Sequence, residues 1–306
     1  MEILLANPRG FCAGVDRAIS IVEVLLQRLG APVYVKHEIV HNRYVVNDLK
    51  RKGAIFVEEL DQVPPQSVLV FSAHGVSQSV QEEAKKRSLR IFDATCPLVI
   101  KVHKEVIKMY EEGKIIVMIG HAGHPEVEGT MGQVPGQIYL VENKEQVAEL
   151  AFPAELDIGF VTQTTLSVDE AKEIVAALQA RFPNITSPKK EDICYATQNR
   201  QDAVKQLSQV CDFIIVVGSP NSSNSNRLRE VALKHNVSAI MIDDIAQIDP
   251  IVVKQHKKIG ITAGASAPEV LVNSVVHYLK MLGVEAVYEA EGVEEKVVFV
   301  MPKELI

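Results

Sequence analysis

The sequence lacks any apolar run that approaches the roughly 20 residues needed to cross a bilayer. Its first residues, Met-Glu-Ile-Leu-Leu-Ala-Asn-Pro-Arg-Gly, have neither the basic stretch nor the long apolar stretch of a signal peptide. Positive charge is not in excess either, because 39 acidic residues against 32 Lys and Arg give a formal net charge of −7. These absences argue against membrane spanning, secretion and nucleic-acid binding. We therefore expect a cytoplasmic protein.

Cysteine is also scarce, with 4 residues in a chain of 306. The four lie far apart and none forms a Cys-x-x-Cys pair, which excludes a disulfide scaffold and weakens a zinc ribbon or a thioredoxin-like motif. For a cysteine taken at random, a buried structural thiol is the better interpretation.

Short apolar runs alternate with amphipathic stretches along the chain, which is about twice as long as a typical single domain. The runs that suit buried parallel strands are residues 3–6, 54–57, 68–71, 115–119, 138–141, 158–161, 213–217, 239–242 and 259–262. This alternation predicts an α/β fold of parallel sheets with right-handed crossovers, divided into two or three lobes.

Three of the cysteines share a context that the fourth does not. Each is followed at once by a helical pattern: Cys12-Ala-Gly-Val-Asp-Arg, Cys96-Pro-Leu-Val-Ile-Lys and Cys194-Tyr-Ala-Thr-Gln-Asn-Arg. A helix N-terminus lowers the pKa of a cysteine and favours the thiolate. The spacing of about one small lobe predicts three similar lobes, each offering one thiolate to a common metal centre. Cys211, beside Asp212 at the entry to a strand, is interpreted as structural.

Polar loops follow five of the predicted strands, where open α/β sheets bind ligands. They combine Gly with Ser, Thr, Asn or His and cover residues 72–77, 120–130, 162–167, 218–226 and 263–267, and the segment 37–43 adds further candidates. Taken singly, such Ser, Thr and Asn residues are most often helix N-caps, first-turn Glu residues are solvated, and a lone His is structural. Their repetition favours an anion pocket that suits phosphate oxygens.

Two metal centres fit three thiolates. Zinc with three cysteines keeps an open position, and an iron–sulfur cluster held by three cysteines leaves one iron open to act as a Lewis acid. The spacing of the cysteines leaves both open.

Nine longer motifs occur in one order over almost the whole chain. They are A-N-P-R-G-F-C-A-G-V-D-R-A-I (6–19), V-H-N-R-Y-V-V (40–46), F-S-A-H-G-V-S (71–77), D-A-T-C-P-L-V (93–99), G-H-A-G-H-P-E-V-E-G-T-M-G (120–132), T-Q-T-T-L-S-V (162–168), D-I-C-Y-A-T-x-N-R-Q (192–201), G-S-x-N-S-S-N-S-N-R-L (218–228) and T-A-G-A-S-A-P (262–268). In these motifs the sequence resembles the 4-hydroxy-3-methylbut-2-enyl diphosphate reductase family, also called the LytB or IspH family.

The resemblance implies a [4Fe–4S] cluster at the centre of three α/β lobes arranged as a trefoil. It implies reductive removal of the hydroxyl of the allylic diphosphate substrate, which gives isopentenyl and dimethylallyl diphosphate in the last step of the non-mevalonate isoprenoid route. No Gly-x-Gly-x-x-Gly fingerprint for binding a nicotinamide or flavin cofactor follows a strand. We therefore expect electrons from an external donor such as ferredoxin or flavodoxin.

The resemblance also assigns roles to residues. The implied cluster ligands are Cys12, Cys96 and Cys194. The implied substrate-binding residues are His41, His74, His124, Thr164, Ser222, Ser223, Asn224 and Ser266. The implied catalytic residues are Glu126 as proton source, with Thr164 and His124 as relays.

From the same reasoning we expect an α/β lobe over residues 1–96, a second over 97–193, a third over 194–282, and a tail over 283–306 that packs on a lobe. The main alternative function is an iron–sulfur hydro-lyase acting on a small phosphorylated or anionic substrate. A non-enzymatic redox or iron sensor is a further alternative, because clusters held by three cysteines are labile, and a zinc hydrolase is another.

Overall fold

The structure, a computed structural model, describes residues 1–153 and 155–305. Its contacts divide the chain into two compact units. Unit 1 comprises Met1–Asp16, Val40–Asp48 and Tyr195–Val298, and unit 2 comprises Arg17–Ile39, Leu49–Cys194 and Phe299–Ile306.

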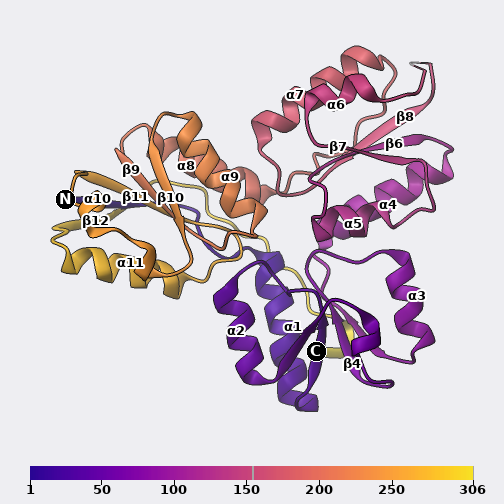
Figure 1. The fold of residues 1–306 in the computed structure, drawn as a ribbon, viewed down its shortest axis with the longest axis horizontal. Helices are drawn as coiled ribbons and strands as arrows, with labels where there is room; N and C mark the ends of the chain where they lie inside the picture. The colour runs from indigo at the N-terminus through magenta and orange to yellow at the C-terminus, as the bar shows by residue number, and fades with distance from the viewer. Residues whose placement is uncertain (154, 306) are drawn as a thin grey trace. The chain divides into compact units, whose positions relative to one another are not determined.

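Unit 1 is built on sheet A, a parallel sheet of five strands (Figure 1). Their spatial order is β10 (Ser238–Ile242), β9 (Phe213–Val217), β11 (Lys258–Ala263), β1 (Glu2–Leu5) and β12 (Ala286–Glu289). The helices that lie wholly in this unit are α8 (Tyr195–Ser208), α9 (Ser223–Lys234), α10 (Pro250–Val253) and α11 (Glu269–Met281), with a 3-10 turn η2 (Ile245–Gln247).

Helices cover both faces of sheet A, as Figure 1 shows. Ile215 of β9 packs in a cluster with Val272 and Leu279 of α11. The neighbouring residue Ile214 packs on the other face with Val204 of α8 and further residues of α9. Both faces of β9, which has a neighbouring strand on each side, are therefore apolar, which explains its uninterrupted run Phe-Ile-Ile-Val-Val.

Unit 2 holds two further parallel sheets. Sheet B has the order β3 (Ala54–Val57), β2 (Val33–Lys36), β4 (Val68–Phe71) and β5 (Arg90–Asp93). Sheet C has the order β7 (Ile138–Val141), β6 (Ile115–Ile119) and β8 (Ile158–Thr162). The helices of these regions are α3 (Gln78–Lys86), α4 (Pro97–Glu111), α5 (Pro125–Met131), α6 (Lys144–Glu149) and α7 (Val168–Arg181), with 3-10 turns η1 (Leu60–Gln62) and η3 (Lys303–Leu305).

Two helices run from unit 1 into unit 2 along the chain, α1 (Ala13–Leu29) and α2 (Arg43–Lys52). Within unit 2, Val106 of α4 packs against Ile116 and Met118 on one face of sheet C. Ile174 and Leu178 of α7 belong to the cluster on the other face. Sheet C thus repeats the two-sided burial of sheet A.

The prediction of parallel α/β lobes is confirmed, and all nine apolar runs coincide with strands. Three strands were missed, namely β2, β5 and β12. Val33-Tyr-Val-Lys and Arg90-Ile-Phe-Asp mix apolar with polar residues, because one side of these strands is less deeply buried. The short strand β12 lies at an edge of sheet A, where only one neighbour buries it.

The pairing of β1 differs from the expected lobe boundaries. Ile3 aligns with Ile259 of β11 on one side and with Val287 of β12 on the other. The range 1–96 therefore contributes strands to two sheets, and the range 283–306 contains an edge strand in place of a simple tail. Pairing between residues so distant along the chain leaves no mark in local periodicity, which is why the sequence pattern missed it.

Among the described residues, no helix combines the length and the apolar character that bilayer spanning requires.

Candidate active site

Each of the three cysteines with a helical context opens a helix. Cys12 directly precedes α1, Cys96 is the N-cap of α4 with Pro97 at the first helical position, and Cys194 directly precedes α8. All three are half-buried, whereas Cys211 is buried in the core beneath sheet A. The prediction that these three cysteines open helices is confirmed.

A second repeat involves the backbone of the same cysteines. The N–H of Cys12 donates to the carbonyl of Ala265 (3.3 Å), and that of Cys96 to the carbonyl of Ala73 (3.0 Å). The N–H of Cys194 donates to the carbonyl of Thr164 (3.1 Å). Each acceptor lies in a polar loop that follows a strand. Ser266 and His74 are the next residues after two of these acceptors, so backbone bonds tie each cysteine to a loop that carries predicted substrate-binding residues.

The predicted lowering of thiol pKa values does not hold at Cys12. Burial raises the pKa of this thiol and outweighs the backbone N–H groups of Val15 and Gly14, which act in the opposite direction. Desolvation disfavours the charged thiolate at this position and opposes the helix N-terminus. Burial also raises the pKa of Cys211, to about 11.

Glu126 and Thr164 form a buried pair in unit 2. The backbone N–H of Thr164 donates to Oε1 of Glu126 (2.6 Å), and its Oγ1 donates to Oε2 (3.0 Å). Only 3% of Glu126 is exposed. Burial raises the pKa of this carboxyl to about 7, although the hydrogen bonds from Thr164 lower it. Glu126 can therefore hold a proton near neutral pH, as a general acid must.

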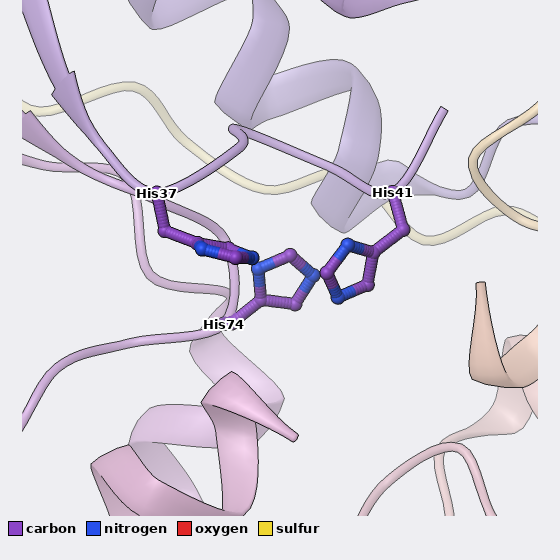
Figure 2. A group of neighbouring side chains, drawn as sticks. All are labelled: His37, His41 and His74. Carbon is purple, nitrogen blue, oxygen red and sulfur yellow. The ribbon is translucent and has the colours of Figure 1, made fainter. Parts of the chain in front are cut away.

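His124 positions the helix that carries Glu126. It is the N-cap of α5, and its Nδ1 accepts a hydrogen bond from the N–H of Glu126 (3.1 Å). The ring of His74 lies 5.8 Å from that of His124 and 5.9 Å from that of His37, edge to face in both cases. Figure 2 shows the rings of His37 and His74; His41, also drawn there, belongs to unit 1.

The remaining predicted binding residues lie in unit 1. Ser222 is the N-cap of α9 and accepts from the N–H of Ser225 (3.3 Å). Oδ1 of Asn224 accepts from the N–H of Ala265 (2.8 Å). Oγ of Ser266 donates to the carbonyl of His41 (2.9 Å). These contacts gather the loops beyond β9 and β11 with the segment before α2, and Ser223 opens the first turn of α9 beside them.

The predicted site residues thus fall into two sets. Unit 1 holds Cys12, His41, Ser222, Ser223, Asn224 and Ser266, and unit 2 holds Cys96, Cys194, His74, His124, Glu126 and Thr164.

Several polar residues at these loops were not predicted. Gln163 is fully buried, and its Oε1 accepts from the N–H of His121 (3.0 Å). Ser225 is also fully buried, and its Oγ lies where a Cβ at Gly218 or Gly264 would stand, which explains both glycines. Asp192 accepts from the N–H of Thr162 (3.0 Å). All three residues lie inside the motifs quoted above, but only some of the polar residues in those motifs were given a role.

The fold and the site define an α/β protein with three parallel sheets in which three cysteines open helices and bond to polar loops beyond the strands. Comparison with known proteins gives the class a family. The model described as "LytB protein" matches residues 3–280, and the chain belongs to the LytB family.

Curated relatives align over nearly the whole chain. A protein of Azoarcus sp. (strain BH72) named 4-hydroxy-3-methylbut-2-enyl diphosphate reductase is 63% identical, with 99% of this chain and 97% of the relative aligned. A protein of Burkholderia mallei (strain ATCC 23344) named 4-hydroxy-3-methylbut-2-enyl diphosphate reductase 2 is 64% identical, with 99% of this chain and 93% of the relative aligned.

Two solved structures are similar as well. The E-1-hydroxy-2-methyl-but-2-enyl-4-diphosphate reductase of Plasmodium falciparum superposes with a TM-score of 0.95 at 40% identity and covers 99% of this chain and 96% of its own. A structure described as (E)-4-hydroxy-3-methyl-but-2-enyl diphosphate reductase, the terminal enzyme of the non-mevalonate pathway, has a TM-score of 0.66 at 31% identity. The match covers 92% of this chain and 99% of the chain in that structure.

Proposed function

We propose that this chain is a 4-hydroxy-3-methylbut-2-enyl diphosphate reductase. It removes the hydroxyl of the allylic diphosphate with two electrons and two protons, and releases water and either isopentenyl or dimethylallyl diphosphate. One observation carries the proposal: Thr164 donates two hydrogen bonds to the carboxyl of Glu126 and accepts one from the N–H of Cys194. A single residue therefore links a buried acid to a cysteine that opens a helix.

The donor set of the chain fits an iron–sulfur cluster. Cys12, Cys96 and Cys194 are half-buried and supply the soft sulfur ligands that such clusters take, and we propose that they hold a [4Fe–4S] cluster. When bound, this cluster supplies single electrons and one open iron that polarises the substrate hydroxyl. Cys211 has no part in it, because it is buried in the core of unit 1.

We assign the proton to Glu126. Its raised pKa, about 7, keeps the carboxyl partly protonated at neutral pH. The Thr164 hydroxyl bonded to the same carboxyl can pass the proton on to the substrate. A positioned acid of this kind contributes roughly 10²–10⁴ in rate.

We assign the diphosphate to the polar loops. Hydroxyls, an amide and imidazoles bind phosphate oxygens without burying an unpaired charge, and the first turn of α9 adds backbone N–H groups. The proposed residues are His41, His74, His124, Ser222, Ser223, Asn224 and Ser266. Holding the diphosphate fixes the position of the allylic carbon and so lowers the entropic part of the barrier.

The electrons come from outside the chain in this proposal. A small electron-transfer protein such as ferredoxin or flavodoxin is the proposed donor, and the cytoplasm is the proposed location.

The experiment that tests this function is anaerobic turnover of the allylic diphosphate with and without a reductant. We expect both isoprenoid products only when the reductant is present, from a brown protein that bleaches in air. Conversion without a reductant would identify a hydro-lyase instead. A colourless protein with one metal ion and no acid-labile sulfide would identify a zinc enzyme.

The cluster ligands have their own test, which uses Cys211 as the matched control. Cys12→Ser, Cys96→Ser and Cys194→Ser should each lose iron and acid-labile sulfide, whereas Cys211→Ser should keep both. An equal loss in all four variants would refute the assignment.

A further inference from the structure

A cation follows each of the three helix-opening cysteines at nearly the same distance along the chain. Arg17 and Lys101 lie five residues after Cys12 and Cys96, and Arg200 lies six residues after Cys194. Each cation stands in the second turn of the helix that its cysteine opens. The contacts of these three side chains repeat as well.

Arg17 holds the main chain in front of Cys96. Its Nη1 donates to the carbonyl of Thr95 (3.1 Å) and its Nη2 to the carbonyl of Asp93 (3.4 Å). The third contact, from Nε to the carbonyl of Val300 (2.9 Å), engages the C-terminal segment of the same unit.

Lys101 holds the main chain in front of Cys194. Its Nζ donates to the carbonyls of Lys190 (2.7 Å) and Glu191 (2.9 Å) and to Oδ1 of Asp192 (3.0 Å). The Asp192 side chain is fully buried and also accepts from the N–H of Thr162. All three donors of the ammonium group are therefore directed at one short segment that ends two residues before the cysteine.

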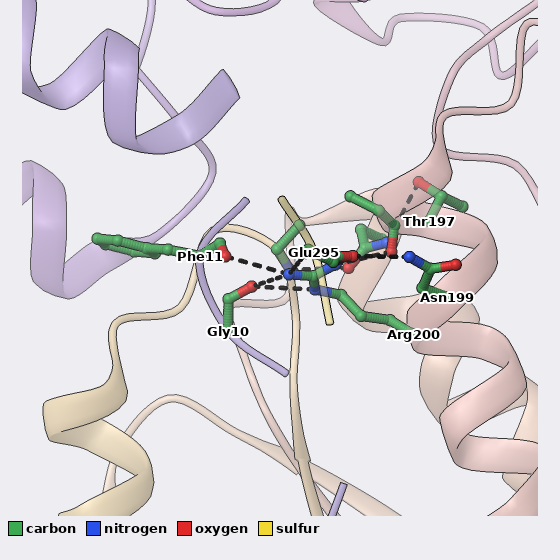
Figure 3. Close-up of polar contacts among 9 residues, drawn as sticks. Gly10, Phe11, Thr197, Asn199, Arg200 and Glu295 are labelled. Atoms are coloured by element: carbon green, nitrogen blue, oxygen red, sulfur yellow. Dashed lines mark hydrogen bonds and ion pairs between the residues drawn. The ribbon is translucent and has the colours of Figure 1, made fainter. Parts of the chain in front are cut away.

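Arg200 holds the main chain in front of Cys12, as Figure 3 shows. Its Nε and Nη2 donate to the carbonyl of Gly10 (2.9 and 2.7 Å), and Nη2 also donates to the carbonyl of Phe11 (3.1 Å). The side chain is fully buried, and the carboxylate of Glu295 neutralises it from the other side (2.9 Å). A buried guanidinium is tolerated because these partners satisfy it.

The order of these contacts is cyclic. The helix after Cys12 supplies the cation for Cys96, the helix after Cys96 supplies the cation for Cys194, and the helix after Cys194 supplies the cation for Cys12. In every case the cation binds carbonyl oxygens that precede a cysteine other than its own.

We propose that Arg17, Lys101 and Arg200 are positioning residues that form this cycle, each fixing the loop of the next cysteine for cluster binding. The proposal rests on the proposed function, in which the three cysteines hold the cluster. Hydrogen bonds from a charged donor are stronger than neutral ones and lose less to competing water when partly buried. Loops fixed in this way keep the thiols in place before the cluster arrives.

The test measures each thiol separately in the full-length chain after its cluster has been removed with a chelator. Iodoacetamide labelling, resolved by mass spectrometry, reports how often each cysteine loop opens. Lys101→Gln should speed the labelling of Cys194 by about tenfold, the effect of losing charged hydrogen bonds. Arg17→Gln should do the same at Cys96, and Arg200→Gln at Cys12.

Lys104→Gln is the matched control, because Lys104 lies exposed on the same helix as Lys101. It should leave the labelling of all three thiols unchanged. Faster labelling of the cysteine on the cation's own helix, or of all three together, would overturn the cycle. Slower labelling would overturn it too, because removal of a positive charge alone lowers the thiolate fraction.

Circular dichroism and a conservative substitution show whether an effect on labelling comes from misfolding. Lys101 is 30% exposed, so its variant is expected to fold, and far-ultraviolet circular dichroism checks that it does. For the buried Arg200, Arg200→Lys keeps the charge with fewer donors, and it should give a smaller rise in the labelling rate of Cys12 than Arg200→Gln.

Iron release and cluster binding keep the two proposals separate. In loaded protein, Lys101→Gln should release iron to a chelator faster than Lys104→Gln. A wild-type protein that binds no cluster would refute the proposed function, whereas the labelling pattern alone decides the cycle.

Discussion

At the scale of single residues, the pair formed by Glu126 and Thr164 carries the proposed acid–base chemistry. Burial pushes the carboxyl toward its neutral form, and the two hydrogen bonds from Thr164 oppose that shift without cancelling it. The result is a carboxyl whose pKa, about 7, suits the role of general acid that we propose for it.

Replacing this acid should separate binding from proton transfer. Glu126→Gln keeps an oxygen that can accept from Thr164 but has no acidic proton. We expect turnover to fall roughly 10²–10⁴-fold, with substrate affinity within a few-fold of wild type. Steady-state kinetics and equilibrium binding of the diphosphate measure the two effects. Turnover close to wild type would remove Glu126 from the mechanism.

The same carboxyl should leave a mark on stability. Its pKa rises from 4.5 in the unfolded chain to about 7 in the folded protein, so the folded state binds the proton more tightly. This contribution is complete below pH 4.5 and is lost as the pH rises through about 7. The urea midpoint of wild type relative to Glu126→Gln should therefore fall between pH 5 and pH 8.

The comparison with Glu126→Gln also removes the opposing effect of another group. Burial lowers the pKa of His103 from 6.5 to about 4. Below pH 6.5 the unfolded chain therefore binds a proton at His103 that the folded protein does not, and the folded state is destabilised as the pH falls. Both proteins contain His103, and its effect cancels in their difference. A constant difference across this pH range would contradict the shift at Glu126.

At the scale of elements, the start of α9 holds both the cap of the helix and two residues of the proposed diphosphate site. Oγ of Ser222 caps the helix by accepting from the N–H of Ser225, whereas Ser223 stands at the first helical position. Ser222→Ala should therefore lower both the free energy of unfolding, by about 1 kcal/mol, and the affinity for the diphosphate. Ser223→Ala should lower the affinity alone. Urea unfolding and isothermal titration calorimetry distinguish them, and equal stability of both variants would argue against the cap.

The elements also mark how far the sequence could predict this molecule. Runs such as 213–217 are apolar throughout because both faces of β9 are covered, and they were predicted correctly. β2, with its mixture of apolar and polar residues, was not. The hydrogen bonds between Thr164 and Glu126 join the loop after β8 to α5. The spacing of residues along the chain does not predict such a contact. Resemblance to a family named both residues, and the coordinates supply their contact.

At the scale of the whole molecule, residues 283–298 complete unit 1. β12 pairs with β1, and the carboxylate of Glu295 neutralises the buried Arg200. Deletion of residues 283–306 should remove both and destabilise unit 1 by more than the roughly 3–5 kcal/mol of a broken buried ion pair.

A shorter deletion is the control for this experiment. Removal of residues 299–306 leaves β12 and Glu295 in place, so the stability of unit 1 should change little. Thermal unfolding followed by circular dichroism compares the two truncated chains. The prediction fails if both unfold at the same temperature.

The pairing of β1 has a consequence for biosynthesis. β1 finds its two neighbours, β11 and β12, only after the intervening residues 6–257 have been synthesised. Sheets B and C, whose strands are close in sequence, can assemble while translation continues. Cys12 therefore reaches its final surroundings last of the three cysteines, and in the proposed function the loading of iron and sulfide has to wait until β11 and β12 have been made.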